Sequence, residues 1–257
     1  MSTTSQASQR IAALLDENSF VEIGAKVTAR ATDFNLKQTK TPSDGVITGY
    51  GVIDGNLVYV YSQDVSVLNG TVGEMHAKKI TRLYDMAMKT GAPVIGLIDC
   101  AGLRLQEATD ALEAFGEIYM KQTLASGLIP QITGIFGTCG GGMALVPALT
   151  DFTLMMEGTS YMFLTGPKVV KTVTGEDVSQ ENLGGASVHS TKSGVTHFTA
   201  KTEEEGLALI RTLLSYIPQN NLEEAPYVDC TDPIDRLEDS LNDIIPDSPN
   251  KPYDMYE

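Results

Sequence analysis

Cysteine and long apolar runs are the features that this 257-residue sequence most clearly lacks. Its three cysteines, Cys100, Cys139 and Cys230, are too few and too scattered for a disulfide framework, and none lies in a zinc-type CxxC pair. No apolar run approaches the length of a membrane span, so we expect no transmembrane segment. The polar start, MSTTSQASQR, lacks the apolar core of a secretory signal. We therefore expect a cytoplasmic protein with reduced thiols.

Positive charge is also scarce. The chain has 18 Lys and Arg against 33 Asp and Glu, which gives a net charge of −15. Nucleic-acid binding depends on clustered Lys and Arg, so this balance argues against a nucleic-acid partner. Part of the acidity gathers near the end of the chain, where acidic residues are interleaved with prolines. Taken alone, residues 224–257 are typical of a solvated acidic tail or linker.

Histidine supports neither a metal site nor a catalytic triad. The sequence contains three histidines, His76, His189 and His197. The first falls on a predicted helix, and the other two are separated in a predicted loop region. We expect no bound metal.

Strand and helix patterns alternate along the chain. The runs GVITGYGVI and LVYVYSQD, joined at Asp54-Gly55, predict a β-hairpin. VIGLID at 94–99 and QITGIFG predict buried strands, and FTLMM and SYMFL predict further strands. Helices are predicted over residues 10–20, 71–89, 108–126, 203–217 and the segment PKVVKTV. Repeated strand, loop and helix units indicate one α/β domain, residues 1–257, with a mixed, mostly parallel sheet.

The glycine-rich segment 137–142, GTCGGG, lies between a predicted strand and a predicted helix that begins at about Met143. Glycine lets the backbone approach a ligand, and N–H groups at a helix start can bind an anion. The same geometry serves phosphate binding or an oxyanion hole for a thioester. The Lys and Ser/Thr of a P-loop are missing after Gly142, and the spacing is not GxGxxG, which disfavours phosphate. Glycines used only for tight packing are the other interpretation.

A second loop, DCAGLRLQE at residues 99–107, also follows a buried strand. Ligands of α/β sheets lie beyond the carboxyl ends of the strands, so the two loops are expected to converge on one atom. Two converging N–H donors are what an enolate oxygen needs. Taken alone, Arg104, Gln106 and Glu107 indicate a surface ion pair beside a helix start.

Many segments of the chain carry a family resemblance, among them RIAALLDENSF, DGVITGYGVIDG, GEMHAKKI, MAMKTGAPVIGLID, PQITGIFGTCGGG, SYMFLTGPKVVK and NNLEEAPYVDCTDPIDR. These segments are spread over nearly the whole chain. The sequence resembles the biotin-dependent acyl-CoA carboxyltransferases, such as propionyl-CoA carboxylase β subunits and related decarboxylases. The resemblance implies a crotonase-like (ClpP/crotonase) α/β fold, with acyl-CoA on this half and carboxybiotin on a homologous second half. The chain is then either a naturally split subunit or part of a longer one, and residues 224–257 become a strap that docks on the partner.

The resemblance also implies roles for particular residues. The backbone N–H groups of Leu103 and of Gly141 or Gly142 are expected to form the oxyanion hole. No side-chain base is required, because decarboxylated biotin removes the α-proton. The positions expected to bind substrate are Cys100, Ala101, Gly102, Arg104, Gly140, Met143, Thr165 and Gly166. Leu103 and Met143 are larger than the usual family residues, and we expect them to narrow or reshape the acyl pocket.

The expected reaction is carboxyl transfer between biotin and the α-carbon of a short-chain acyl-CoA through a thioester enolate. The implied partners are a complementary C-terminal-type carboxyltransferase subunit, a biotin carrier, and biotin carboxylase or decarboxylase subunits, in a hetero- or homo-oligomer. One alternative is a decarboxylase component acting on malonyl-, methylmalonyl- or glutaconyl-CoA. Others are a non-catalytic CoA-binding module and a crotonase-type hydratase, for which Glu107 is the only nearby carboxylate.

Overall fold

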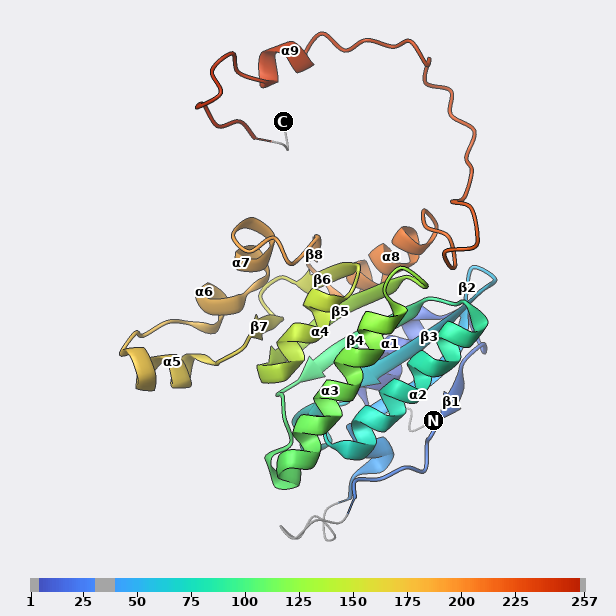
Figure 1. Cartoon of the computed structure of the whole chain (residues 1–257), viewed down its shortest axis with the longest axis vertical. Helices are drawn as coiled ribbons and strands as arrows, with labels where there is room; N and C mark the ends of the chain where they lie inside the picture. The colour runs from blue at the N-terminus through green and yellow to red at the C-terminus, as the bar shows by residue number, and fades with distance from the viewer. Residues whose placement is uncertain (1–4, 31–39, 255–257) are drawn as a thin grey trace. The chain divides into compact units, whose positions relative to one another are not determined.

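The computed structural model describes residues 5–30 and 40–254. The chain divides into two units, residues 1–226 and residues 227–257 (Figure 1). The larger unit contains the sheet and its covering helices.

One mixed sheet runs through the larger unit. Its strands follow the order β1-β2-β3-β4-β5-β6-β8, and β7 pairs with β5. β1, β2 and β3 pair antiparallel, whereas the pairs from β3 to β8 are parallel, which confirms the mixed, mostly parallel sheet. The strands are β1 (Val21–Ile23), β2 (Val46–Ile53), β3 (Asn56–Gln63), β4 (Val94–Cys100), β5 (Gln131–Gly140), β6 (Phe152–Met156), β7 (Tyr161–Phe163) and β8 (Phe198–Ala200).

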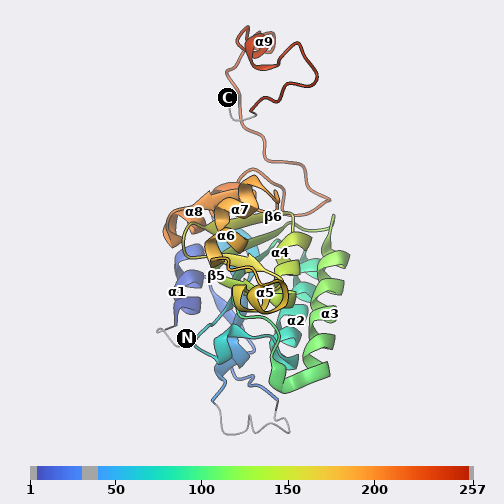
Figure 2. The same ribbon diagram turned by 90° about the vertical axis from the view of Figure 1, so that its left-hand side faces the viewer.

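Helices cover both faces of this sheet. α2 (Glu74–Thr90) and α3 (Ala108–Ala125) lie on one face, and α1 (Gln6–Leu14) and α8 (Glu203–Leu214) lie on the other (Figures 1 and 2). The position of strand β4 explains why its residues 94–98 contain no polar side chain. Val94 and Ile98 pack into the core beneath α2 and α3, whereas Ile95 and Leu97 pack into the core beneath α1 and α8. A parallel strand buried on both faces has no polar side.

Two helix boundaries differ from the sequence-based expectation. The first helix is α1 rather than residues 10–20, because Ser5 caps it and accepts a hydrogen bond from the backbone N–H of Ser8. The following residues lead into β1, an unpredicted edge strand. The last long helix, α8, ends at Leu214 instead of Ile217.

The segment before α8 is more ordered than expected. The helix at PKVVKTV is confirmed as α5 (Pro167–Thr174), but the predicted loop contains α6 (Gln180–Gly184), α7 (Ala186–Thr191) and β8. His189 therefore lies on a helix, and His197 directly precedes a strand. The elements α6, α7 and β8 are too short to give a clear periodic signal in the sequence. The other short elements of this unit are the 3₁₀ helices η2 (Pro42–Gly45), η3 (Leu68–Gly70), η4 (Leu105–Glu107) and η5 (Gly141–Ala144), and the helix α4 (Leu145–Leu149).

The smaller unit carries one short helix among its described residues, α9 (Leu241–Ile244). Several of its apolar side chains are exposed to solvent, including Tyr227, Ile234 and Leu237. Across residues 5–30 and 40–254, no helix has both the length and the hydrophobicity that crossing a membrane requires.

Candidate active site

The two glycine loops meet beyond the carboxyl ends of β4 and β5, as the sequence predicted. In the backbone register of these two parallel strands, Cys100 lies opposite Cys139. An added Cβ on Gly102 would lie 2.9 Å from the carbonyl oxygen of Gly140, and one on Gly140 would lie 3.1 Å from that of Ala101. Glycine at both positions therefore lets the two backbones approach each other closely.

The turn after β5 begins later than predicted. Residues 137–140 still belong to β5, because β7 pairs alongside them, with Thr138 opposite Tyr161 and Gly140 opposite Phe163. The backbone turns only at Gly141, where φ is +61°, and it then forms η5. Met143 lies inside η5, and the next helix, α4, begins at Leu145. The first N–H groups of such a turn have no acceptor within the helix.

The N–H of Leu103 is available to a ligand. The N–H of Val72 donates to Gly102 O at 2.9 Å, and the N–H of Arg104 donates to Val72 O at 3.0 Å. In a trans peptide the C=O and N–H groups point in opposite directions, so the N–H of Leu103 points away from Val72. Within the described part of the chain this N–H has no recorded hydrogen-bond acceptor.

Around η5, one side is packed and the other is open. The Tyr119 hydroxyl donates a hydrogen bond to Gly142 O, and an added Cβ on Gly142 would lie 3.0 Å from that hydroxyl oxygen. An added Cβ on Gly141, in contrast, would have only the Cα of Gly102 near it, at 3.9 Å. The side of Gly141 that faces Gly102 is therefore not packed by side chains.

Three further predicted positions lie in the loop after β4 or in the connection that follows β7. Ala101 is exposed in the loop after β4. Thr165 is exposed and Gly166 is half-buried, and both connect β7 to α5. Because β7 pairs with the end of β5, this connection follows directly from the strand that flanks Gly140.

Two predicted substrate contacts, Cys100 and Met143, have side chains that are fully buried. The Cys100 Sγ accepts a hydrogen bond from the N–H of Gly102 at 3.3 Å, and burial raises the pKa of this thiol to about 12. The Gln63 amide donates to the Met143 Sδ at 3.7 Å. The expectation that the Met143 side chain reshapes the pocket directly is thus wrong, because that side chain packs in the core beneath the turn. The Leu103 side chain is half-buried, and its effect on the acyl pocket stays a prediction.

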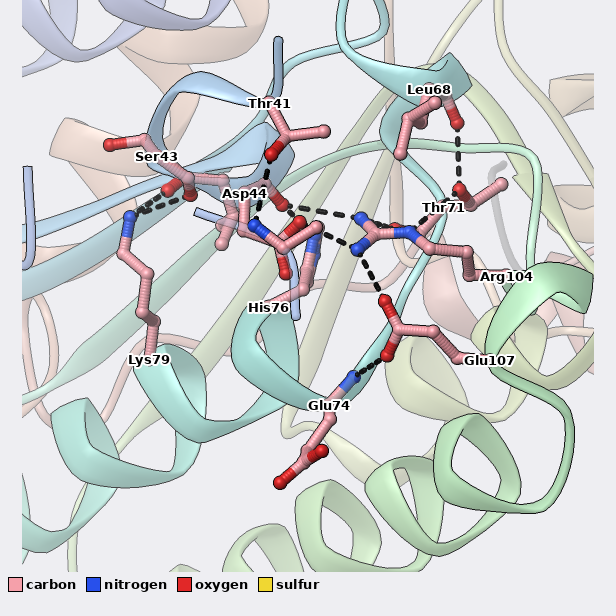
Figure 3. A network of polar contacts seen from close by, with 12 residues as sticks. Thr41, Ser43, Asp44, Leu68, Thr71, Glu74, His76, Lys79, Arg104 and Glu107 are labelled. Carbon is pink, nitrogen blue, oxygen red and sulfur yellow. Dashed lines mark hydrogen bonds and ion pairs between the residues drawn. The ribbon is translucent and has the colours of Figure 1, made fainter. Parts of the chain in front are cut away.

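Arg104 is not part of a surface ion pair, because its side chain is fully buried (Figure 3). Its Nη1 lies 2.5 Å from Asp44 Oδ1 and 2.9 Å from Glu107 Oε1. Its Nη2 donates to Thr71 O at 2.7 Å. Burial raises the pKa of the Asp44 carboxyl in spite of the neighbouring guanidinium. Direct binding of substrate by this guanidinium is not supported, since its donors are already occupied.

Asp44 lies in a turn with strained backbone geometry. The φ angles of Ser43 and Asp44 are +52° and +49°, which side chains rarely adopt, and Gly45 follows with +72°. Lys79 donates to the carbonyls of Ser43 and Val46, and Nδ1 of His76 lies 2.9 Å from Asp44 O (Figure 3). Burial lowers the pKa of Lys79 to about 8. Burial also lowers the pKa of His76, so this ring is neutral at pH 7.

A second, partly buried network supports the end of β4 from the opposite face. Arg10 Nη1 lies 3.3 Å from Asp99 Oδ2, and its other nitrogens bind Glu203. Asp99 Oδ1 accepts a hydrogen bond from the N–H of Thr138 at 3.3 Å. Neither network is predictable from the sequence pattern. The residues that form them come from distant segments, and no local pattern marks a charged residue as buried.

A cavity of about 540 Å³ lies beside the Asp44 turn. Its lining includes Ser43, Glu22, Asp64 and Ser66, and none of the predicted site residues. The candidate site is therefore the open contact between the two glycine turns rather than this cavity.

Comparisons with known proteins give matches over almost the whole chain. The carboxyl transferase domain family matches residues 4–257. The chain is 51% identical over 249 residues to the methylmalonyl-CoA decarboxylase subunit alpha of Veillonella parvula, covering 97% of this chain and 49% of that protein. It is also 51% identical over 251 residues to a propionyl-CoA carboxylase carboxyltransferase subunit of Haloferax mediterranei, covering 98% and 49%. The chain spans about half the length of the curated relatives that it matches.

A solved structure is similar over almost the same range. The transcarboxylase 12S structure with methylmalonyl-CoA and methylmalonic acid bound superimposes with a TM-score of 0.88 at 41% identity. The match covers 96% of this chain and 48% of that one.

Proposed function

This chain belongs to the carboxyl transferase domain family, and from that premise we propose that it is the acyl-CoA-binding half of a biotin-dependent carboxyltransferase. The expected crotonase-like α/β fold is confirmed by the transcarboxylase 12S match. The proposed reaction moves a carboxyl group between biotin and the α-carbon of a short-chain acyl-CoA. The observation that carries the proposal is the meeting of two glycine turns beside the N–H of Leu103, which has no recorded acceptor among the residues that the structure describes.

The proposed chemistry is carried by backbone groups. When the α-carbon of the thioester loses a proton or a carboxyl group, negative charge develops on the thioester oxygen. The N–H of Leu103 and that of Gly141 or Gly142 would donate to this oxygen, and because the fold already orients them, no reorganisation is needed during the reaction. Biotin, once held by a complementary half, would supply the carboxyl carrier and the basic atom for the α-proton.

The hydratase alternative requires Glu107 as its base, but this carboxylate already has hydrogen-bond partners inside the protein. Glu107 is only 4% exposed, and its two carboxylate oxygens bind the Arg104 guanidinium and the N–H of Glu74, at 2.9 and 2.6 Å. A carboxylate held in this way has no free oxygen with which to activate water. The proposed carboxyl transfer does not require such a base, because biotin would accept the α-proton.

The proposed substrate pair is propionyl-CoA and methylmalonyl-CoA. The names of the two 51%-identical relatives support this pair, as does the methylmalonyl-CoA in the transcarboxylase structure. One of those relatives is a decarboxylase subunit and the other is a carboxylase subunit. Decarboxylation at the same site is therefore a second candidate function. In that reaction carbon dioxide leaves the acyl-CoA for biotin.

The proposed partners are a complementary C-terminal-type carboxyltransferase half, a biotin carrier, and a biotin carboxylase or decarboxylase subunit, in a cytoplasmic oligomer. Support comes from the apolar side chains that α3 exposes, Leu112, Met120 and Leu124, which a partner would cover. The acidic residues 224–257 would act as a docking strap for the complementary half.

Calorimetry and a transfer assay test this proposal. We expect the isolated chain to bind methylmalonyl-CoA without decarboxylating it, and we expect activity to appear when the complementary half and a biotin acceptor are added. Activity of this chain alone with free biotin would contradict the divided site. Binding without any activity in the full assembly would favour a non-catalytic CoA-binding module instead.

A further inference from the structure

We propose that Arg104 is a positioning residue, which aims the N–H of Leu103 at the thioester oxygen without touching the substrate. This inference rests on the proposed function, because it assigns a supporting group to the same oxyanion hole. It replaces the expectation that Arg104 binds substrate directly, which its complete burial does not support.

Arg104 makes two hydrogen bonds to the segment Thr71-Val72. Its backbone N–H donates to Val72 O at 3.0 Å, while its Nη2 donates to Thr71 O at 2.7 Å (Figure 3). The peptide bond between Gly102 and Leu103 is held on both sides. On one side are these two hydrogen bonds of Arg104, and on the other the N–H of Val72 donates to Gly102 O. Rotation of that peptide would break one of these contacts, so the direction of the Leu103 N–H is set by them.

Two buried carboxylates fix the guanidinium in turn. Asp44 and Glu107, from opposite sides, both bind Nη1. Glu107 also accepts the N–H of Glu74 at the first turn of α2, and an added Cβ on Gly73 would lie 2.4 Å from Glu107 Oε1. The loop is thus tied to the start of α2 and to the Asp44 turn.

Only a planar guanidinium can make all these contacts together. An arginine presents its donors in a rigid fork, whereas a lysine offers one compact ammonium. Arg104→Lys keeps the positive charge for the two carboxylates but loses the simultaneous contact with Thr71. We therefore expect the substitution to misplace the Leu103 N–H while leaving the charge balance intact.

The first experiment measures steady-state decarboxylation of methylmalonyl-CoA by the assembled enzyme. Arg104→Lys should lower kcat by about 10-fold to 100-fold, because a small misplacement of a reacting contact is costly. KM should stay within about twofold, since the lost contact matters mainly in the transition state. Arg211→Lys is the matched control: Arg211 also binds two carboxylates, Asp16 and Asp54, and a backbone carbonyl, that of Leu14, but its contacts lie outside the candidate site.

A second experiment tests whether Arg104 acts through Leu103. Replacing Leu103 by its α-hydroxy acid analogue converts the peptide bond between Gly102 and Leu103 to an ester. This removes the N–H and also weakens Gly102 O as the acceptor of the Val72 N–H. If Arg104 orients that N–H, then Arg104→Lys should have little further effect on kcat in the ester background. Should Arg104→Lys fail to fold, Glu107→Gln, which removes one anchoring charge, takes its place in the same cycle.

The outcomes separate the two proposals. An ester variant with normal kcat would overturn the oxyanion role of Leu103 and with it the proposed mechanism. An ester variant with low kcat beside a normal Arg104→Lys variant would overturn the positioning role alone. Additive losses in the double variant would also overturn it, because Arg104 would then act independently of Leu103. Losses that do not add, with a normal Arg211→Lys control, would support it.

Discussion

The two turns that meet at the candidate site are held in place by different means. The turn after β4 depends on charged side chains, since Arg104 links it to Asp44 and Glu107 inside the protein. The turn after β5 depends on the absence of side chains, since Gly140 and Gly141 allow close approach and a left-handed backbone. The first turn should therefore be sensitive to charge, and the second to the size of the residue.

Asp44→Asn tests the charged turn. We expect the free energy of unfolding to fall by about 3 kcal/mol, because the change removes one anionic partner of a buried guanidinium. Urea denaturation would measure this loss. Asp54→Asn is a matched control, because Asp54 has a φ of +50°, close to the +49° of Asp44, but its side chain is 63% exposed and pairs with Arg211. Its loss should stay below about 1 kcal/mol. Equal losses would show that burial does not distinguish the two sites.

Gly141→Val tests the turn that depends on glycine. We expect turnover of the assembled enzyme to fall by about 10²–10³-fold, because the change disturbs the N–H groups at the thioester oxygen. A β-branched residue is also strained at a φ of +61°. Gly127→Val controls for that strain, because Gly127 has a φ of +75° with open space around it, near the opposite end of β5. Near-normal turnover in cooperatively folded Gly141→Val protein would leave only a packing role for this glycine.

Lys79 adds a pH dependence to the charged turn alone. Burial lowers its pKa from 10.5 to about 8, so the folded protein favours the neutral amine. Between pH 8 and pH 10.5 the unfolded chain binds more protons than the folded one, so the free energy of unfolding should rise with pH. The full rise is about 3 kcal/mol.

Denaturation at pH 8 and pH 10, in wild type and in Lys79→Gln, measures the contribution of Lys79. The difference in unfolding free energy between the two proteins should grow in favour of wild type as pH increases. Parallel pH profiles would mean that the Lys79 amine is protonated across the whole range in the folded protein.

Tyr119→Phe should give the smallest effect. The substitution removes the hydroxyl that donates to Gly142 O but keeps the ring. We expect a loss of about 1 kcal/mol in unfolding free energy and only a few-fold decrease in kcat. Thermal melting and kinetics on one preparation would measure both. A decrease as large as that of Gly141→Val would mean that the second turn also depends on a polar side chain.

The strands and the meeting of the two loops were predictable because local patterns carry that information. VIGLID has the uniform apolarity of a strand buried on both faces, and parallel strands bring their carboxyl ends to one edge. The ends of the elements were less predictable. The extension of β5 to Gly140 depends on pairing with β7, a strand more than twenty residues away in sequence.

The sequence by itself determined the family, the alternation of strands and helices, and the glycines that keep side chains out of the site. These features follow from residue type and spacing, which act locally. Only the tertiary structure decided that Arg104 is a buried anchor and that Asp44 is its partner, 60 positions away. The physical reason is that a charge is stable in the interior only when folding brings its counter-charge into contact, and no single segment of the sequence contains both.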